Sequence, residues 1–198
     1  MMKPIASWTA CLGLLFAGVG FAAEHKIDRL GPALGRPRAL FGVGDALYLA
    51  TSAQVVRFEL ARAGDAPPKL VPLVQAQLLA GGLAVDGAAL FWGNQDDGAV
   101  VRGLVPGLLG GAAGALKTLA TGLTGLCGAV AADRRAVYVS TCADLMAVPR
   151  AGGAPRKVAG GAGPLFIADS GFIYLFSGDK LLKGPKCGGK ARTLAQGQ

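Results

Sequence analysis

The sequence predicts an all-β protein built from four diverged copies of one four-stranded sheet. Glycine accounts for 32 of the 198 residues, and aromatic residues make up only 7%. The apolar residues fall in many short runs separated by Gly, and none of these runs has the length of an amphipathic helix. The same short unit also recurs along the chain at intervals typical of structural repeats.

The last two copies are the most alike. Residues 132–139 (ADRRAVYV) lie over residues 168–175 (ADSGFIYL) at an offset of 36 residues. The same offset carries Gly152-Gly153 onto Gly188-Gly189, and residues 158–161 onto 194–197. Several matches at one offset without a gap indicate an internal duplication.

The two earlier copies are looser but share the central unit. Residues 85–92 (VDGAALFW) repeat it, residues 43–49 (VGDALYL) repeat it without the leading Asp, and the loop 62–70 lies over 150–158. One aromatic residue marks each copy, at spacings of 43, 47 and 36: Tyr48, Phe91, Tyr138 and Tyr174. The predicted copies are residues 37–77, 78–123, 124–161 and 162–198.

Each copy is expected to form four short strands. In the third copy these are residues 127–132, 136–142, 144–148 and 156–159. The leading aspartates, Asp86, Asp133 and Asp169, can hydrogen-bond the backbone of their own turns. Because one four-stranded sheet cannot cover both of its faces, the copies are expected to stack around an axis as the blades of a β-propeller.

The repeat resembles that of bacterial exported propeller proteins similar to the YWTD and NHL classes. The resemblance rests on "VDGAALFWGNQDDGAVVRGLVP…LKTLATG" and "VYVSTCADLMAVPRAGGAPRKVAGG". In that family an Asp-turn-Val-Tyr-Trp strand precedes a Val-Pro-x-x-Gly-Gly-x-Pro hairpin and a Leu-Ala-x-Gly close. The likeness covers residues 37–198. It implies a fold and says little about activity.

The number of copies leaves the architecture open. Related propellers usually close with six or seven blades, and four is the low end of what closes. Residues 26–30 (KIDRL), within the N-terminal segment 24–36, could supply a leftover final strand. A closed four-bladed ring, an incomplete or open ring that associates with another chain, and a shortened propeller are the alternatives.

Residues 1–23 have the pattern of a signal peptide. Lys3 precedes the uncharged stretch 8–21, and Phe21-Ala22-Ala23 offers a cleavage site before Glu24. The chain is therefore expected to be exported, to a periplasmic, cell-surface or secreted location, with no membrane span after cleavage. A retained N-terminal anchor is the alternative.

Positive charge is concentrated in the second half of the chain. Residues 24–98 carry 7 basic and 8 acidic groups, whereas residues 99–198 carry 12 basic and 4 acidic groups. A solvated basic face is the first interpretation of this asymmetry, and the hypothesis beside it is a partner, either an acidic cell-surface polymer or an unknown protein. Nucleic acid is not expected, since no aromatic-interleaved basic motif occurs. The densest basic tract is the predicted surface for an anionic partner: Lys180, Lys183, Lys186, Lys190 and Arg192.

No catalytic, cofactor or metal site is predicted. His25 is the only histidine, and it lies near the expected new N-terminus. No paired carboxylates suited to general acid–base chemistry stand out. Residues 94–98 (NQDDG) resemble a calcium loop but lack the downstream bidentate Glu. Their Asp-Gly pair is a hairpin signal instead, and no CxxC or HxxxH spacing suggests zinc.

Cys127 and Cys142 are predicted to form a disulfide. If the turn centres between Arg134 and Arg135, facing residues sum to 269, as 127 and 142 do. Facing residues lie within disulfide range, and export favours oxidation. Two separate buried thiols are the alternative. Cys187 has no obvious partner, so it is either free or linked to another chain.

The sequence therefore predicts an exported, non-enzymatic propeller module for binding or scaffolding, with self-association if the ring is incomplete. One alternative is a metal-assisted hydrolase or lyase that uses the central cup. The other is a degenerate propeller fragment without its own activity.

Overall fold

The computed structural model describes residues 37–43, 46–59, 69–75, 79–104, 116–164 and 166–197. The chain divides into two compact units, Met1–Pro32 and Ala33–Gln198, and the described residues belong to the second. The predicted signal peptide and the leftover strand 26–30 lie outside them. No helix of the described residues is long and apolar enough to cross a membrane.

The regular structure of the described residues is entirely β, which confirms the predicted class. The strands are β1 (Pro37–Val43), β2 (Ala46–Thr51), β3 (Gln54–Glu59), β4 (Lys69–Gln75), β5 (Leu79–Asp86), β6 (Ala89–Asn94), β7 (Val100–Leu104), β8 (Lys117–Ala120), β9 (Val130–Ala132), β10 (Ala136–Ser140), β11 (Asp144–Pro149), β12 (Arg156–Gly160), β13 (Phe166–Ala168), β14 (Phe172–Ser177), β15 (Lys180–Pro185) and β16 (Arg192–Gln196).

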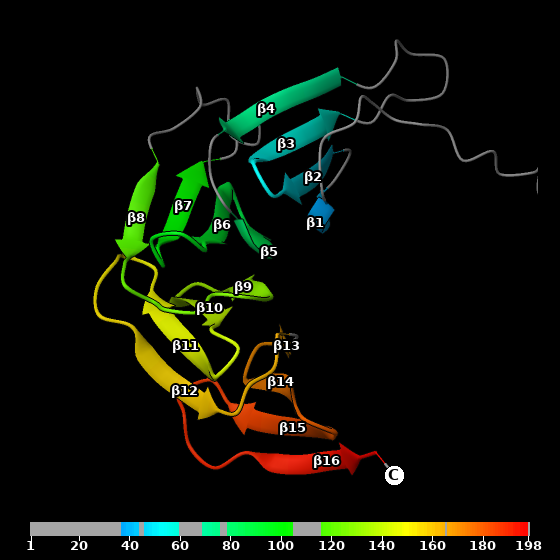
Figure 1. The fold of residues 1–198 in the computed structure, drawn as a ribbon, viewed down its shortest axis with the longest axis vertical. Coiled ribbons are helices and arrows are strands. Elements are labelled where there is room, and N and C mark those ends of the chain that lie inside the picture. The colour runs from blue at the N-terminus through cyan, green and yellow to red at the C-terminus, as the bar shows by residue number, and fades with distance from the viewer. Residues whose placement is uncertain are drawn as a thin grey trace, which may run out of the picture. The chain divides into compact units, whose positions relative to one another are not determined.

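These strands form four separate antiparallel sheets in which consecutive strands pair (Figure 1). We call them blade 1 (β1–β4), blade 2 (β5–β8), blade 3 (β9–β12) and blade 4 (β13–β16). Their first strands are neighbours, since β5 contacts both β1 and β9, and β9 contacts β13. The sheets are therefore consistent with successive propeller blades, and the ring that they begin is not closed.

The register of blade 3 follows the predicted turn. Val137 pairs with Ala132, and Val139 pairs with Val130, so both pairs sum to 269. The first two strands predicted for blade 3 are longer than the observed ones. The first strand begins at Val130, and the second ends at Ser140, because Cys142 has a φ of 62°, which no strand residue adopts.

The apolar core lies between successive blades. Tyr48 of blade 1 packs with Leu83 and Trp92 of blade 2. Phe91 of blade 2 packs with Val137 of blade 3 in the next cluster. Tyr138 and Leu145 of blade 3 pack with Ile173 and Leu175 of blade 4. Burying one such large side chain stabilises the fold by roughly 1.5–3 kcal/mol, so each blade depends on its neighbour.

The first strands approach one another so closely that two glycines are required. A Cβ atom at Gly82 would clash with the backbone of Gly128–Val130, and one at Gly128 would clash with Pro164. The Ala129 N–H donates to the Pro164 carbonyl across the same junction, at 2.7 Å. The inner strands of blades 2, 3 and 4 are thus held backbone to backbone.

Candidate functional site

Asp133 connects blade 3 to blade 4. Its Oδ1 accepts hydrogen bonds from the backbone N–H groups of Arg135 (2.8 Å) and Ala136 (2.9 Å), as predicted for a turn aspartate. Its Oδ2 accepts from the Tyr138 hydroxyl (3.1 Å) and from the Lys186 ammonium of the next blade (2.9 Å). The side chains of Lys186 and Asp133 are only 13% and 27% exposed.

The surroundings shift the pKa values of this cluster in opposite directions. Burial alone would raise the pKa of Asp133, but hydrogen bonds from Lys186, Ala136 and Arg135 lower it to about 2. Burial raises the pKa of Tyr138 to about 12, helped by the charge of Asp133 and the hydrogen bond to it. The carboxylate is therefore charged and the phenol neutral at any ordinary pH.

A related contact joins blade 2 to blade 3. The Arg150 guanidinium forms an ion pair with the Asp86 carboxylate and donates to the Asp86 carbonyl at 3.2 Å. Arg150 also lies over the Phe91 ring, 4.9 Å from its centroid, as Lys186 lies 5.4 Å from the centroid of Tyr138. Each cation thus reaches back to the Asp and the aromatic anchor of the preceding blade.

A second contact also recurs between blades. At the start of β8, Lys117 donates to the Ala151 carbonyl in the hairpin of blade 3 (2.7 Å). At the start of β12, Arg156 donates to the Cys187 carbonyl in the hairpin of blade 4 (2.8 Å). Ala151 and Cys187 are 36 residues apart, which is the repeat offset.

The sequence analysis did not predict these contacts between blades, because it explained the aspartates only by hydrogen bonds within their own turns. The signal was present in the repeat, since the offset of 36 carries Arg150 onto Lys186 and Asp133 onto Asp169. The Asp position and the cation position both recur from copy to copy. Such paired recurrence indicates a contact between the Asp of one blade and the cation of the next blade.

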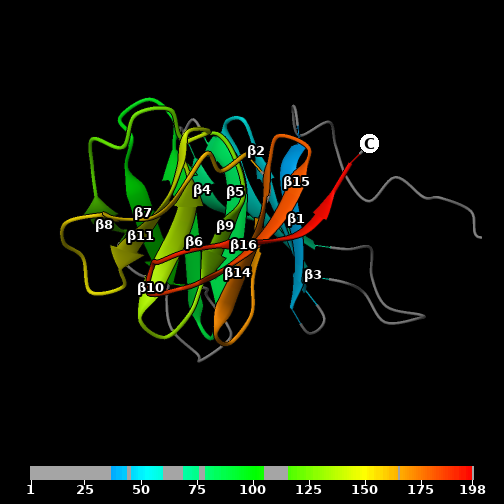
Figure 2. The ribbon, with the colours of Figure 1, turned by 90° about the horizontal axis from the view of Figure 1, so that it is seen from below.

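Turns gather at two edges of the sheets. In an antiparallel sheet of consecutive strands, the turn between strands one and two lies beside the hairpin between strands three and four. The Arg150 N–H accordingly donates to the Arg135 carbonyl (3.0 Å), and the Lys186 N–H to the Gly171 carbonyl (3.3 Å). Most labelled strands in Figure 2 run between an upper and a lower edge. We call the edge with these two kinds of turn the hairpin rim.

The hairpin rim is strongly basic. Its described side chains include four carboxylates, Glu59, Asp86, Asp133 and Asp169, and eleven cations: Arg57, Arg102, Lys117, Arg134, Arg135, Arg150, Arg156, Lys183, Lys186, Lys190 and Arg192. The opposite rim carries Asp96, Asp97, Asp144 and Asp179 at its described turns. Lys180 lies beside them, and Lys157 forms an ion pair with Asp144 at 2.7 Å. The positive charge of the second half of the chain is therefore concentrated on one edge.

Part of this rim is hollowed between blades 2 and 3. A pocket of about 400 Å³ is lined by Asp86, Arg102, Arg134 and Arg150, together with small residues of the β5–β6 turn. The Arg102 Nε atom is buried and has no hydrogen-bond partner among the described residues. Arg134 is exposed at the β9–β10 turn. Guanidinium groups bind carboxylate, sulfate and phosphate oxygens through paired N–H donors.

The predicted basic tract does not form one surface. The Lys186 side chain is largely buried, where it forms the ion pair with Asp133. Lys183 lies over the Phe172 and Tyr174 rings of its own blade, at 3.9 and 5.2 Å. Lys180 follows the turn on the opposite rim. Lys190 and Arg192 are exposed on the hairpin rim.

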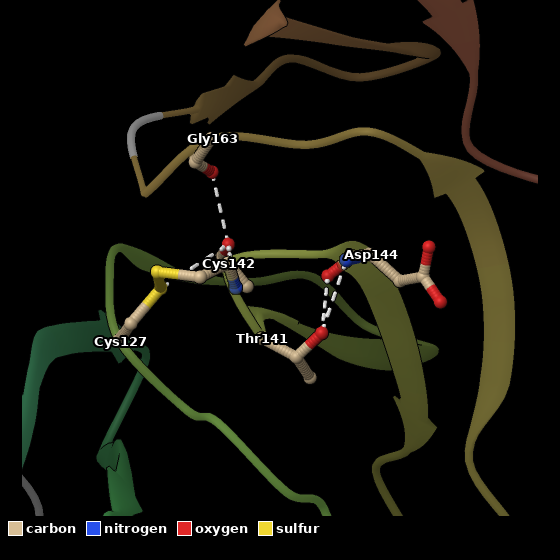
Figure 3. The surroundings of a disulfide bond; sticks show 6 residues. Cys127, Thr141, Cys142, Asp144 and Gly163 are labelled. Atoms are coloured by element: carbon tan, nitrogen blue, oxygen red, sulfur yellow. Dashed lines mark hydrogen bonds between the residues drawn. A yellow bond between two sulfur atoms is a disulfide. The ribbon is translucent and has the colours of Figure 1, made fainter.

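A disulfide joins Cys127 to Cys142, the predicted pair (Figure 3). Their Cα atoms are 5.7 Å apart. Cys127 lies before β9, and its N–H donates to the Ser140 carbonyl (3.2 Å). The Ser140 hydroxyl donates to the Gly163 carbonyl on the way to blade 4 (2.9 Å). Cys187 is free and exposed.

The loop at residues 94–98 is a hairpin turn. Asp97 Oδ1 accepts from the Ala99 N–H (2.9 Å), and the Asn94 N–H donates to the Ala99 carbonyl (2.8 Å). The described residues contain no group of three His, Cys, Asp or Glu side chains placed to hold a metal ion.

No protein-family model matches the sequence, and no curated protein shows significant similarity to it. Solved structures do show the same fold. A nidogen/laminin complex aligns with a TM-score of 0.61 at 20% identity, over 77% of this chain and 62% of that chain. PorZ, a bacterial surface component of the type-IX secretion system of Porphyromonas gingivalis, aligns with a TM-score of 0.56 at 13% identity, over 80% of this chain and 21% of that chain.

The extracellular domain of a putative one-component system from B. thetaiotaomicron aligns with a TM-score of 0.58 at 12% identity, over 86% of this chain and 24% of that chain. The chain thus spans less than two thirds of the length of each of these three structures. Together with the four sheets, the likeness defines this chain as a protein of the β-propeller type.

Proposed function

We propose that this chain is an exported, non-enzymatic propeller module that binds an acidic polysaccharide along its hairpin rim. The observation that carries the proposal is the excess of cations on that rim, eleven against four carboxylates among the described side chains. Some of these cations hold the blades together, but Arg134, Arg135, Lys190 and Arg192 are exposed.

An extended polyanion suits this arrangement better than a small ligand. The exposed cations are spread over the β9–β10 turn of blade 3 and the β15–β16 hairpin of blade 4, so a chain molecule can neutralise several of them at once. Each exposed charge pair is worth little alone, but several pairs on one chain add through a raised effective concentration. The pocket beside Arg102 and Arg134 can take one acidic group of such a chain.

Export is supported by two features. Residues 1–23 have the signal-peptide pattern, and the Cys127–Cys142 disulfide suits an oxidising compartment. Two of the similar structures are themselves a bacterial surface component and an extracellular domain.

Charge reversal tests the proposal. The double variant Arg134→Glu/Arg135→Glu is expected to weaken binding to dextran sulfate by roughly tenfold or more at low salt, since two attractions become repulsions. Binding is measured by isothermal titration calorimetry, with neutral dextran as the ligand control. The matched control variant is Lys157→Glu/Lys180→Glu, which changes the net charge equally away from the hairpin rim and is expected to keep binding within about twofold.

Equal weakening in both double variants would mean that net charge alone attracts the polymer, and it would overturn the assignment to the rim. Binding to anionic lipid vesicles in the absence of dextran sulfate binding would replace the polysaccharide by a membrane surface. Binding that does not weaken with added salt would contradict an electrostatic site.

A further inference from the structure

The pocket between blades 2 and 3 contains a guanidinium group without a counter-charge. Arg102 on β7 forms no hydrogen bond or ion pair with the other described residues, and its Nε atom is buried. The Arg150 guanidinium in the same pocket is already paired with the Asp86 carboxylate. A buried donor without an acceptor destabilises a fold, so an anion that supplies acceptors to Arg102 would relieve this cost.

Arg102 also faces a second cation of its own blade. It is the register partner of Lys117 on β8, and like charges directly opposite each other destabilise a sheet. Arg102 is also the partner of Phe91 on β6, which packs toward blade 3. Both cations therefore lie on the face of blade 2 that is turned toward the pocket.

The junction between blades 3 and 4 has the same kind of contact without the extra guanidinium. There the aromatic anchor is Tyr138, which pairs with Ala147 and donates its hydroxyl to Asp133. One carboxylate, Asp133, meets one cation, Lys186. In blade 2 the anchor is a phenylalanine without a hydroxyl, and Arg102 takes the place of Ala147. Joining two blades therefore does not require the guanidinium of Arg102.

Small side chains keep this pocket open. The β5–β6 turn has Gly87-Ala88 where the β9–β10 turn has Arg134-Arg135. Arg134 lines the pocket from blade 3, and Leu104, which is 44% exposed, adds an apolar wall. The volume of about 400 Å³ falls in the range of pockets that bind small organic molecules, roughly 300–1,000 Å³. The pocket therefore has room for a sugar residue beside an acidic group.

We propose that this pocket is a subsite for one sugar residue that carries a tetrahedral oxyanion ester, either a sulfate or a phosphate group. Arg102 and Arg134 bind the ester oxygens from two different blades, and Leu104 contacts the sugar ring. One guanidinium can occupy both oxygens of a planar carboxylate, whereas a tetrahedral ester offers three terminal oxygens to separate donors. The inference rests on the proposed function, because this residue would belong to the same acidic polysaccharide.

Titration calorimetry with four sugars tests the specificity of the pocket. Glucose 6-sulfate and glucose 6-phosphate are each expected to bind with a dissociation constant at least about tenfold lower than that of glucuronic acid, and glucose is expected not to bind. The sulfate ester and the glucuronate carry the same charge, so their difference reports the geometry of the acidic group. The tighter of the two esters identifies the group that the site takes. Glucuronic acid that binds as tightly as the esters would overturn the proposal.

Replacement of Arg102 separates binding from folding. Arg102→Met keeps an apolar stem and removes the charge, and it is expected to raise the dissociation constant of the tighter ester by about tenfold or more. Its melting temperature without ligand is expected to equal or exceed that of the wild type, because a guanidinium opposite Lys117 is removed. Lys180→Met is the matched control on the opposite rim, and it is expected to keep ester binding within about twofold. A lower melting temperature of Arg102→Met would give Arg102 a structural role, and unchanged ester binding would remove it from the site; either result would overturn the proposal.

The dextran sulfate assay distinguishes this inference from the proposed function. Arg102→Met is expected to keep dextran sulfate binding within about threefold, because the exposed cations Arg135, Lys190 and Arg192 remain. If the esters do not bind a chain that still binds dextran sulfate, the subsite is overturned and the proposed function stands. A chain that binds neither would overturn both.

Discussion

At the scale of the residue, Asp133 carries two separable roles. Oδ1 closes the turn of its own blade, and Oδ2 binds Lys186 and Tyr138. An asparagine keeps an acceptor at Oδ1 and replaces the acceptor at Oδ2 by a donor. Asp169 has the same turn geometry but no cation from a later blade within the described residues, which makes it the internal comparison.

We predict that Asp133→Asn lowers the free energy of unfolding by about 1.5–3 kcal/mol, the range for a hydrogen bond to a charged group. Asp169→Asn is expected to cost less than about 0.5 kcal/mol. Urea unfolding followed by circular dichroism measures both values. Equal losses would mean that the turn, and not the contact between blades, accounts for the effect.

The same residue predicts a pH dependence. The pKa of Asp133 is about 2 in the folded chain and 3.8 when unperturbed. Because the pKa of this carboxyl is lower in the folded chain, the charged carboxylate stabilises the fold above pH 3.8. This stabilisation is lost as the pH falls towards 2. The difference in unfolding free energy between the wild type and Asp133→Asn should therefore shrink between pH 4 and pH 2. A difference that stays constant over this window would contradict the assigned role.

At the scale of the element, the disulfide fixes the open end of the β9–β10 pair, away from the turn that joins the two strands. It spans 15 residues and fastens the segment before β9 to the residue after Thr141, where the positive φ of Cys142 has already ended the strand. A cross-link of this length stabilises the fold by about 3 kcal/mol by restricting the unfolded chain.

We predict that Cys127→Ser/Cys142→Ser loses about 3 kcal/mol of unfolding free energy, and that a reducing agent lowers the wild type to the same level. Cys187→Ser is the control, because Cys187 is exposed and free, and it is expected to be neutral. Reducing agent that destabilises the double serine variant as well would show that the effect lies elsewhere.

Strand positions and register could be predicted because they depend on local patterns. The turn centred between Arg134 and Arg135 places Val137 opposite Ala132 and the two cysteines near each other. The start of β9 at Val130 could not be predicted, because Cys127 pairs its backbone with Ser140 outside the regular register. The contacts between blades depend on tertiary packing, and the prediction treated Lys186 as a free surface cation for that reason.

At the scale of the whole molecule, one physical arrangement connects fold and proposed function. Thin sheets bury their apolar faces against one another. The hairpins supply Arg150 and Lys186, which reach across the junctions between blades 2 and 3 and between blades 3 and 4. The exposed cations Arg134, Arg135, Lys190 and Arg192 lie on the same rim. The basic rim is therefore a consequence of how the blades are joined, and the field that it creates is available to an acidic polymer.

Hydrogen exchange with and without dextran sulfate tests this account most directly. We predict added protection at the hairpin-rim segments 133–136, 149–156 and 185–192, and unchanged exchange at the opposite turns 94–98, 141–144 and 177–180. Protection confined to those opposite turns, or no change at any of the six segments while the polymer is bound, would contradict the assignment of the hairpin rim as the binding surface.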